Sequence, residues 1–83
     1  GYADEYQTRS IFTTFLPNQS ENFDKFYRKI RHMEVTTAML QEFLFYNRKC
    51  ENILEHLDKF TEIVEKNKPS ELSTDKNEKN LYM

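Results

Sequence analysis

The fold is decided by the stretch from Asn18 to Lys68, which reads NQSENFDKFYRKIRHMEVTTAMLQEFLFYNRKCENILEHLDKFTEIVEKNK and contains neither glycine nor proline. Glycine and proline are the residues that most often interrupt a helix, so their absence favours a continuous one. Asn18 and Glu21 have the spacing of a helix N-cap pair. The stretch therefore predicts one long amphipathic helix over about residues 19–66.

Large apolar side chains recur along this stretch at alternating steps of three and four residues. That spacing places them in one seam along a helix, as at the a and d positions of a coiled coil. The seam slips by one residue between Leu40 and Phe43, and the cluster Phe43–Tyr46 surrounds the helix with apolar side chains, which favours a bundle over a two-stranded coil. We predict an all-α fold, either a coiled coil or a small helical bundle. The predicted oligomer or partner interface comprises Phe23, Phe26, Ile30, Met33, Leu40, Phe43, Leu44, Tyr46, Cys50, Ile53, Leu57, Phe60 and Val64.

The two ends of the chain differ in composition from the long stretch. Residues 1–17 mix tyrosine, phenylalanine and β-branched residues and end at Pro17, which disfavours helix at Leu16. We expect this segment to be a short arm that either docks on the helix or is frayed. Residues 68–83 are polar and poor in large apolar side chains, so they predict a disordered tail. Between the arm and the tail, residues 18–67 form the helical association module.

The overall composition limits the function classes. The 83 residues carry 12 basic and 14 acidic side chains, and the net charge of -2 gives no general attraction to nucleic acid or to an anionic membrane. Cys50 is the single cysteine, and no apolar stretch approaches the roughly 20 residues of a transmembrane helix. These observations predict an intracellular protein, cytoplasmic or nuclear, whose partners are other proteins.

Residues that carry catalysis or bind cofactors form no recognisable motif. The two histidines, His32 and His56, are not placed in a nucleophile motif with Cys50, and no Glu-x-x-His pair occurs. A glycine-rich phosphate loop is excluded because the only glycine is Gly1. The sequence thus predicts no enzymatic activity, no cofactor and no metal site.

Charged side chains are sorted along the predicted helix, basic in its first half and acidic in its second. The acidic residues follow one face from Glu51 to Glu65. The layout opposes the macrodipole of a single long helix, so the dipole does not explain it. Either the two faces bind partners of opposite charge or they are simply solvated. The candidate partner-binding basic face comprises Lys25, Arg28, Lys29 and His32.

The function predicted from these patterns is a non-enzymatic oligomerisation or scaffold module that assembles a larger complex through its apolar heptad seam. It would form a homodimer, a higher helical oligomer or one strand of a heteromeric complex, in parallel or antiparallel pairing. The alternative is a self-contained, peptide-binding helical adaptor that uses an aromatic groove and the basic face. In that alternative the chain turns back near Asn47 and Arg48, and residues 1–16 supply a third element.

Overall fold

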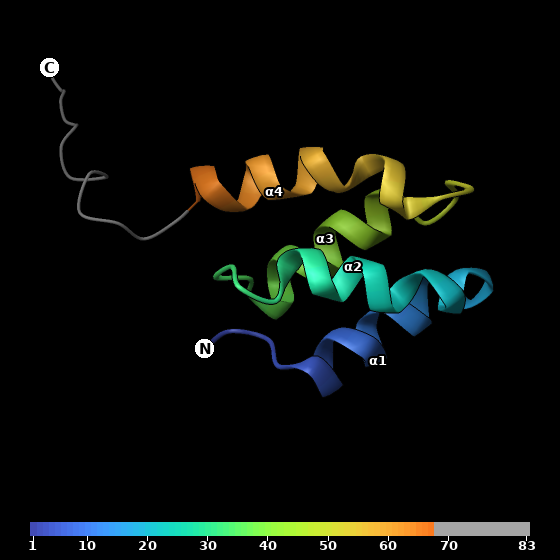
Figure 1. Cartoon of the computed structure of the whole chain (residues 1–83), viewed down its shortest axis with the longest axis horizontal. Coiled ribbons are helices and arrows are strands. Elements are labelled where there is room, and N and C mark those ends of the chain that lie inside the picture. The colour runs from blue at the N-terminus through green and yellow to red at the C-terminus, as the bar shows by residue number, and fades with distance from the viewer. Residues whose placement is uncertain (68–83) are drawn as a thin grey trace, which may run out of the picture.

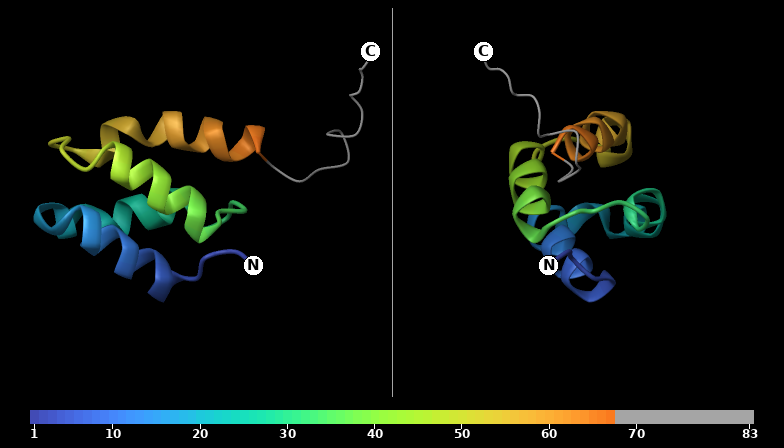
Figure 2. Two further views of the ribbon diagram at one scale, coloured as in Figure 1. Left: turned by 180° about the vertical axis from the view of Figure 1, so that it is seen from behind. Right: turned by 90° about the vertical axis from the view of Figure 1, so that its left-hand side faces the viewer.

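The computed structural model describes residues 1–67, and every regular element in this part is helical. The predicted tail at 68–83 lies outside the described residues. Viewed end on, the helices surround one interior, with α2 and α3 on opposite sides (Figures 1 and 2). The elements are α1 (Glu5–Phe15), the 3-10 helix η1 (Pro17–Asn22), α2 (Phe23–Ile30), α3 (Thr37–Tyr46), the 3-10 helix η2 (Ile53–His56) and α4 (Leu57–Lys66).

The single long helix predicted for residues 19–66 is wrong, and so is the coiled coil. The chain turns back twice within this stretch and forms a compact globule of short helices. Each short helix keeps an apolar face at the same three- and four-residue steps, and all of these faces point into one core. The repeat was read correctly as helical, but it records packing within one chain.

The first interruption lies between α2 and α3, and it is made without glycine or proline. Thr36 has an extended backbone, and its hydroxyl accepts a hydrogen bond from the amide of Met39 at 3.1 Å, which starts α3. Val35 is buried, and its carbonyl accepts the amide of Ala3 at 2.8 Å. The loop is thus held by a cap on one side and by a buried side chain on the other.

The second interruption follows α3 and is built from two asparagines. Asn47 closes α3, because its side-chain amide donates to the carbonyl of Phe43 at 2.9 Å. Asn52 starts η2, because its side-chain oxygen accepts the amide of Leu54 at 3.0 Å. The turn that the alternative interpretation placed near Asn47 and Arg48 is therefore present.

A buried glutamine ties the two halves of the chain together. The Gln19 side chain accepts the amide of Ile53 at 2.8 Å and donates to the carbonyl of Cys50 at 2.9 Å. Asn22 donates to the same Gln19 oxygen at 3.1 Å. These bonds satisfy polar groups that burial would otherwise leave unpaired, so they fix η1 against η2.

Most of the N-terminal segment forms helix α1, and its Phe12 and Leu16 are buried in the core. Asp4 and Gln7 form a reciprocal capping box at its start. Helix α1 ends at Phe15, as the step from Leu16 to Pro17 predicts. The N-cap pair predicted downstream, Asn18 with Glu21, is wrong: η1 occupies this segment, and α2 begins at Phe23 without a side-chain cap.

Phenylalanine rings from all four α-helices form the core. Phe12 of α1 contacts the rings of Phe23 and Phe26 of α2, with centroid distances of 5.4 and 5.1 Å. Phe60 of α4 stacks on Phe26 at 6.1 Å and on Phe43 of α3 at 4.3 Å. Burying each such side chain contributes roughly 1.5–3 kcal/mol, so this cluster holds the helices together.

The backbone reaches this arrangement without unusual conformations. No described residue has a positive φ angle, and no described peptide bond is cis. Both turns therefore use conformations open to any L-amino acid.

Candidate docking surface

Most residues of the predicted interface lie in the core of the single chain. Ten of the thirteen are buried, while Met33 and Cys50 are partly buried and Tyr46 is exposed. Their burial satisfies the apolar seam without a second chain, which removes the physical reason for expecting a coiled coil. The ten buried members are Phe23, Phe26, Ile30, Leu40, Phe43, Leu44, Ile53, Leu57, Phe60 and Val64.

Helix α3 differs from the other helices because it is apolar on its outer side as well. Its inner side buries Leu40 and Leu44 completely. On its outer side Phe45 is 52% exposed and Tyr46 is 85% exposed. Exposed aromatic side chains next to polar ones, here Gln41 and Glu42, are typical of an interaction site. The outer side of α3 is therefore a candidate docking surface.

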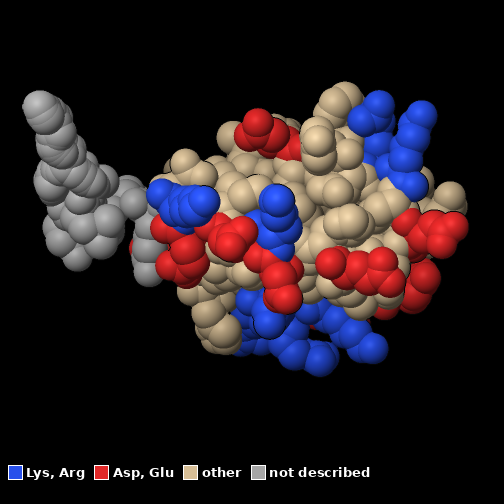
Figure 3. All heavy atoms as spheres, turned by 90° about the horizontal axis from the view of Figure 1, so that it is seen from above, with Lys and Arg blue, Asp and Glu red and all other residues tan. Residues whose placement is uncertain are grey.

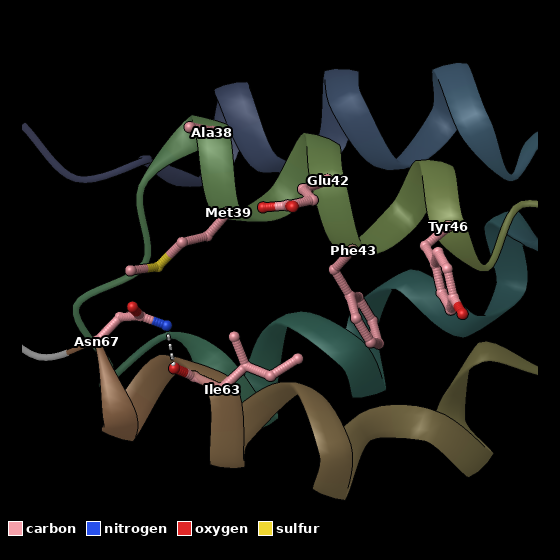
Figure 4. A pocket seen from close by; sticks show the side chains of 7 residues that line it. All are labelled: Ala38, Met39, Glu42, Phe43, Tyr46, Ile63 and Asn67. Carbon is pink, nitrogen blue, oxygen red and sulfur yellow. Dashed lines mark hydrogen bonds between the residues drawn. The ribbon is translucent and has the colours of Figure 1, made fainter.

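A groove separates α3 from α4 next to this outer side (Figure 4). Its volume is about 640 Å³, within the range of roughly 300–1,000 Å³ typical of ligand pockets. Phe43 points from α3 toward α4, and the side chain of Ile63 points back toward α3. The side-chain amide of Asn67 donates to the carbonyl of Ile63 at 2.8 Å and so closes the end of α4. The residues that line the groove are Ala38, Met39, Glu42, Phe43, Tyr46, Ile63 and Asn67.

The groove exists because α3 and α4 pack mainly on other elements. Helix α3 lies chiefly against α1, and α4 lies against α2 and η2. The ring contact between α3 and α4 is the stack of Phe43 on Phe60. Away from this stack no large side chain of residues 1–67 fills the space, so an apolar group has room to enter. Among these residues, Glu42 is the only charged one that lines the groove.

Sequence reasoning found part of this surface. The cluster Phe43–Tyr46, which the sequence analysis described as too apolar for one seam, supplies Phe43 and Tyr46 of the groove lining. Ala38, Met39 and Glu42 were missed because they fall outside the heptad positions, and the second turn places Ile63 opposite them only in three dimensions. The signal available in the sequence was the run of four large apolar residues at the end of α3, Phe43–Tyr46.

Phe45 is partly covered by neighbours of its own chain. The guanidinium of Arg48 lies 4.0 Å from the centre of the Phe45 ring, and the ring of Phe15 meets it edge-on at 6.2 Å. Tyr46 makes no such ring contact within the described residues. Tyr46 and Ile63 are therefore the exposed large apolar side chains that line the groove.

The residues considered for chemistry lie apart from this groove. Cys50 is partly buried, and its sulfur accepts a weak contact from the Gln19 side-chain amide at 3.8 Å. His32 is exposed, and His56 is half-buried at the start of α4. Within residues 1–67, no three His, Cys, Asp or Glu side chains are grouped so that they could hold a metal ion. Among the described helices, none has the length and hydropathy needed to span a membrane.

The candidate basic face lies on α2 and just after it. All four of its residues are exposed: Lys25, Arg28, Lys29 and His32. The role of this basic face in partner binding stays a prediction. The sequence analysis concluded that the charge layout opposes the macrodipole of one long helix. That conclusion is wrong, because the helix that carries the basic residues, α2, ends at Ile30 and not beyond residue 60. Arg28 and Lys29 sit in the last turn of this short helix, where cations are favoured.

Comparison with known proteins gives one finding. Residues 5–59 match the family described as "Mitochondrial chaperone BCS1-like, ATPase lid domain". The match extends over about two thirds of the chain, from the start of α1 into the first turn of α4. No curated protein and no solved structure gives a match. What matches is a helical lid domain and not a catalytic site, so the predicted heptad-seam scaffold and the predicted peptide adaptor are both wrong.

Proposed function

We propose that this chain, which belongs to the family of BCS1-like ATPase lid domains, is the lid of an AAA ATPase. We also propose that the lid docks on that enzyme through the outer side of α3. The observation that carries the docking surface is the exposed apolar side of α3 beside the groove. An exposed apolar patch rimmed by polar residues is typical of an interaction site.

The core suits the chain to move as one body. The rings of Phe12, Phe26 and Phe60 connect α1, α2 and α4, and Phe43 adds α3 to the same cluster. Close-packed interiors resist continuous deformation, so a force applied at one helix displaces the whole domain. A lid that closes as a unit can exclude water from a nucleotide site and complete its geometry.

The chain itself supplies no catalytic group in this proposal. Hydrolysis belongs to the ATPase domain, and the lid contributes position and solvent exclusion. Tyr46 and Ile63 would insert against apolar groups of that domain, with Glu42 at the edge of the contact.

The family description also suggests where the protein works. It names a mitochondrial chaperone, so we place the ATPase that carries this lid in mitochondria and not in the cytosol or nucleus. Imaging of the tagged full-length protein tests this location, and exclusion from mitochondria would contradict it.

The docking surface is tested by comparing two exposed tyrosines in the ATPase that carries the lid. Tyr46 is 85% exposed on α3, and Tyr6 is 82% exposed on α1. We expect Tyr46→Lys to lower the rate of ATP hydrolysis by roughly tenfold, because an apolar contact of the docked lid is lost. We expect Tyr6→Lys to leave the rate unchanged.

Circular dichroism of the two variant chains provides the folding control, and both should retain the helicity of the parent. Equal rates for two folded variants would show that the outer side of α3 is not the docking surface.

A further inference from the structure

The surface outside the groove carries two faces of opposite charge on different helices. The basic face consists of Lys25, Arg28 and Lys29 on α2 together with His32, and Arg31 adds a further exposed cation. The acidic face consists of Glu51, Glu55, Asp58 and Glu62, which are all exposed on η2, on α4 and just before them. Figure 3 shows acidic side chains over α4 and a group of basic side chains along the lower edge, on the side of α2. Basic side chains also lie among the acidic ones, because α4 exposes Lys59 and Lys66.

Within residues 1–67, no ion pair joins the residues of these two faces. The ion pair given by the geometry of residues 1–67 joins Glu5 and Arg9 of α1 at 3.5 Å. Lys25, Arg28 and Lys29 have no acidic side chain of the described chain within ion-pair distance. These three cations lie close together on a short helix and repel one another. An acidic surface brought against them would reduce this repulsion and stabilise the contact between the two surfaces.

The two faces lie on different helices and adjoin along one edge of the molecule, and each is open to the opposite face of another copy. The acidic face is turned toward the viewer in Figure 3, while the basic residues project from its lower edge. A contact between unlike patches of identical chains is heterologous, and it repeats head to tail until the assembly closes or extends.

We propose that the basic face of one copy binds the acidic face of a second copy of this chain, and that this contact sets neighbouring lids side by side. The argument is charge complementarity, and it does not depend on the docking role of α3. Exposed ion pairs are individually weak and are screened by salt, so the contact is weak in dilute solution. It strengthens when an assembly holds the copies at high effective concentration.

The test is sedimentation of the purified chain at concentrations up to about 1 mM, in about 20 mM and about 500 mM salt. Because screening shortens the reach of charges from tens of ångströms to a few, association should occur at low salt and vanish at high salt. The mass should rise above the monomer value of 10.1 kDa only in the low-salt buffer. A monomer under every condition overturns the proposal, and so does association that high salt does not weaken.

Charge reversal on each face identifies the contact. Arg28→Glu with Lys29→Glu cancels the charge of the basic face, because two glutamates then stand beside Lys25 and Arg31. Glu55→Lys with Glu62→Lys likewise cancels the charge of the acidic face, where Glu51 and Asp58 remain. Each double variant should lose self-association by roughly tenfold or more. An equimolar mixture of the two should associate again, because the unchanged acidic face of the first variant then meets the unchanged basic face of the second. A mixture that stays monomeric, while the parent chain associates, overturns the assignment of the faces.

A matched control separates a specific contact from net charge. Arg48→Glu with Lys49→Glu changes the net charge as much as the α2 double variant does, but it lies in the turn after α3. This control should associate like the parent chain at low salt. Loss of association in the control would show that net charge alone governs the effect and would overturn the proposal.

Discussion

Helices α2 and α3 have similar lengths and share one core, yet they face the solvent differently. Helix α2 buries Phe26 and Ile30 and presents cations on its other side. Helix α3 buries Leu40 and Leu44 and presents Phe45 and Tyr46. Helix α2 thus buries its apolar face within the domain, whereas α3 keeps apolar side chains on the surface that a neighbouring domain can cover.

The largest expected effect comes from removing the ring that both helices share. Phe60 stacks on Phe26 of α2 and on Phe43 of α3, and it is completely buried. We expect Phe60→Ala to lower the free energy of unfolding by about 3–5 kcal/mol, measured by urea denaturation with circular dichroism. A loss of this size approaches the whole stability of a small domain, so the variant should be largely unfolded at 37 °C.

Phe60→Leu keeps this prediction measurable if the alanine variant does not fold. It should cost about 1–1.5 kcal/mol. Tyr46→Ala, at the exposed aromatic of α3, should change the unfolding free energy by less than about 0.5 kcal/mol. Similar losses at positions 46 and 60 would contradict the division into core and docking surface.

An intermediate effect is expected at the glutamine that joins the segment before α2 to the segment after α3. Gln19→Leu leaves the amide of Ile53 and the carbonyl of Cys50 without partners, and both groups lie in or near the core. We expect the free energy of unfolding to fall by about 1–3 kcal/mol, measured in the same urea titration. Gln41→Leu, at an exposed position of α3, should stay within about 0.5 kcal/mol of the parent chain.

The smallest change in the free energy of unfolding is expected at the start of α3, which differs from the start of α2. Helix α3 has a side-chain cap at Thr36, whereas α2 has none. We expect Thr36→Ala to lower the free energy of unfolding by about 1 kcal/mol, because the amide of Met39 loses its acceptor. Thermal unfolding should show no comparable loss for the neighbouring substitution Thr37→Ala, and equal losses would mean that the cap is not what starts α3.

The sequence predicted the helical class and the residues that are removed from solvent, because the apolar steps of three and four residues record helix faces directly. It did not reveal which surface covers those faces. Phe26 and Phe60 fit a seam between two chains as well as a core within one, since burial satisfies both arrangements. The missing information was where the chain turns.

Both turns were hidden because their signals are short or distant. Thr36, Asn47 and Asn52 are ordinary cap residues, and each could equally sit on the surface of a continuous helix. The bonds from Gln19 to Cys50 and Ile53 span more than thirty residues, so no local pattern shows them. Likewise, the groove requires α3 and α4 to be placed side by side before Met39 and Ile63 can line it.

The absence of positive φ angles from the described backbone bears on how this domain can change over evolution. A turn that requires glycine ties the fold to one residue, because other side chains are strained there. Here the turns depend on capping side chains, and Ser, Thr, Asp and Asn are largely exchangeable in that role. A chain without glycine at its turns also has fewer conformations to lose on folding. The lid can therefore vary its turns while keeping its core, so distant relatives should resemble one another in their buried positions more than in their loops.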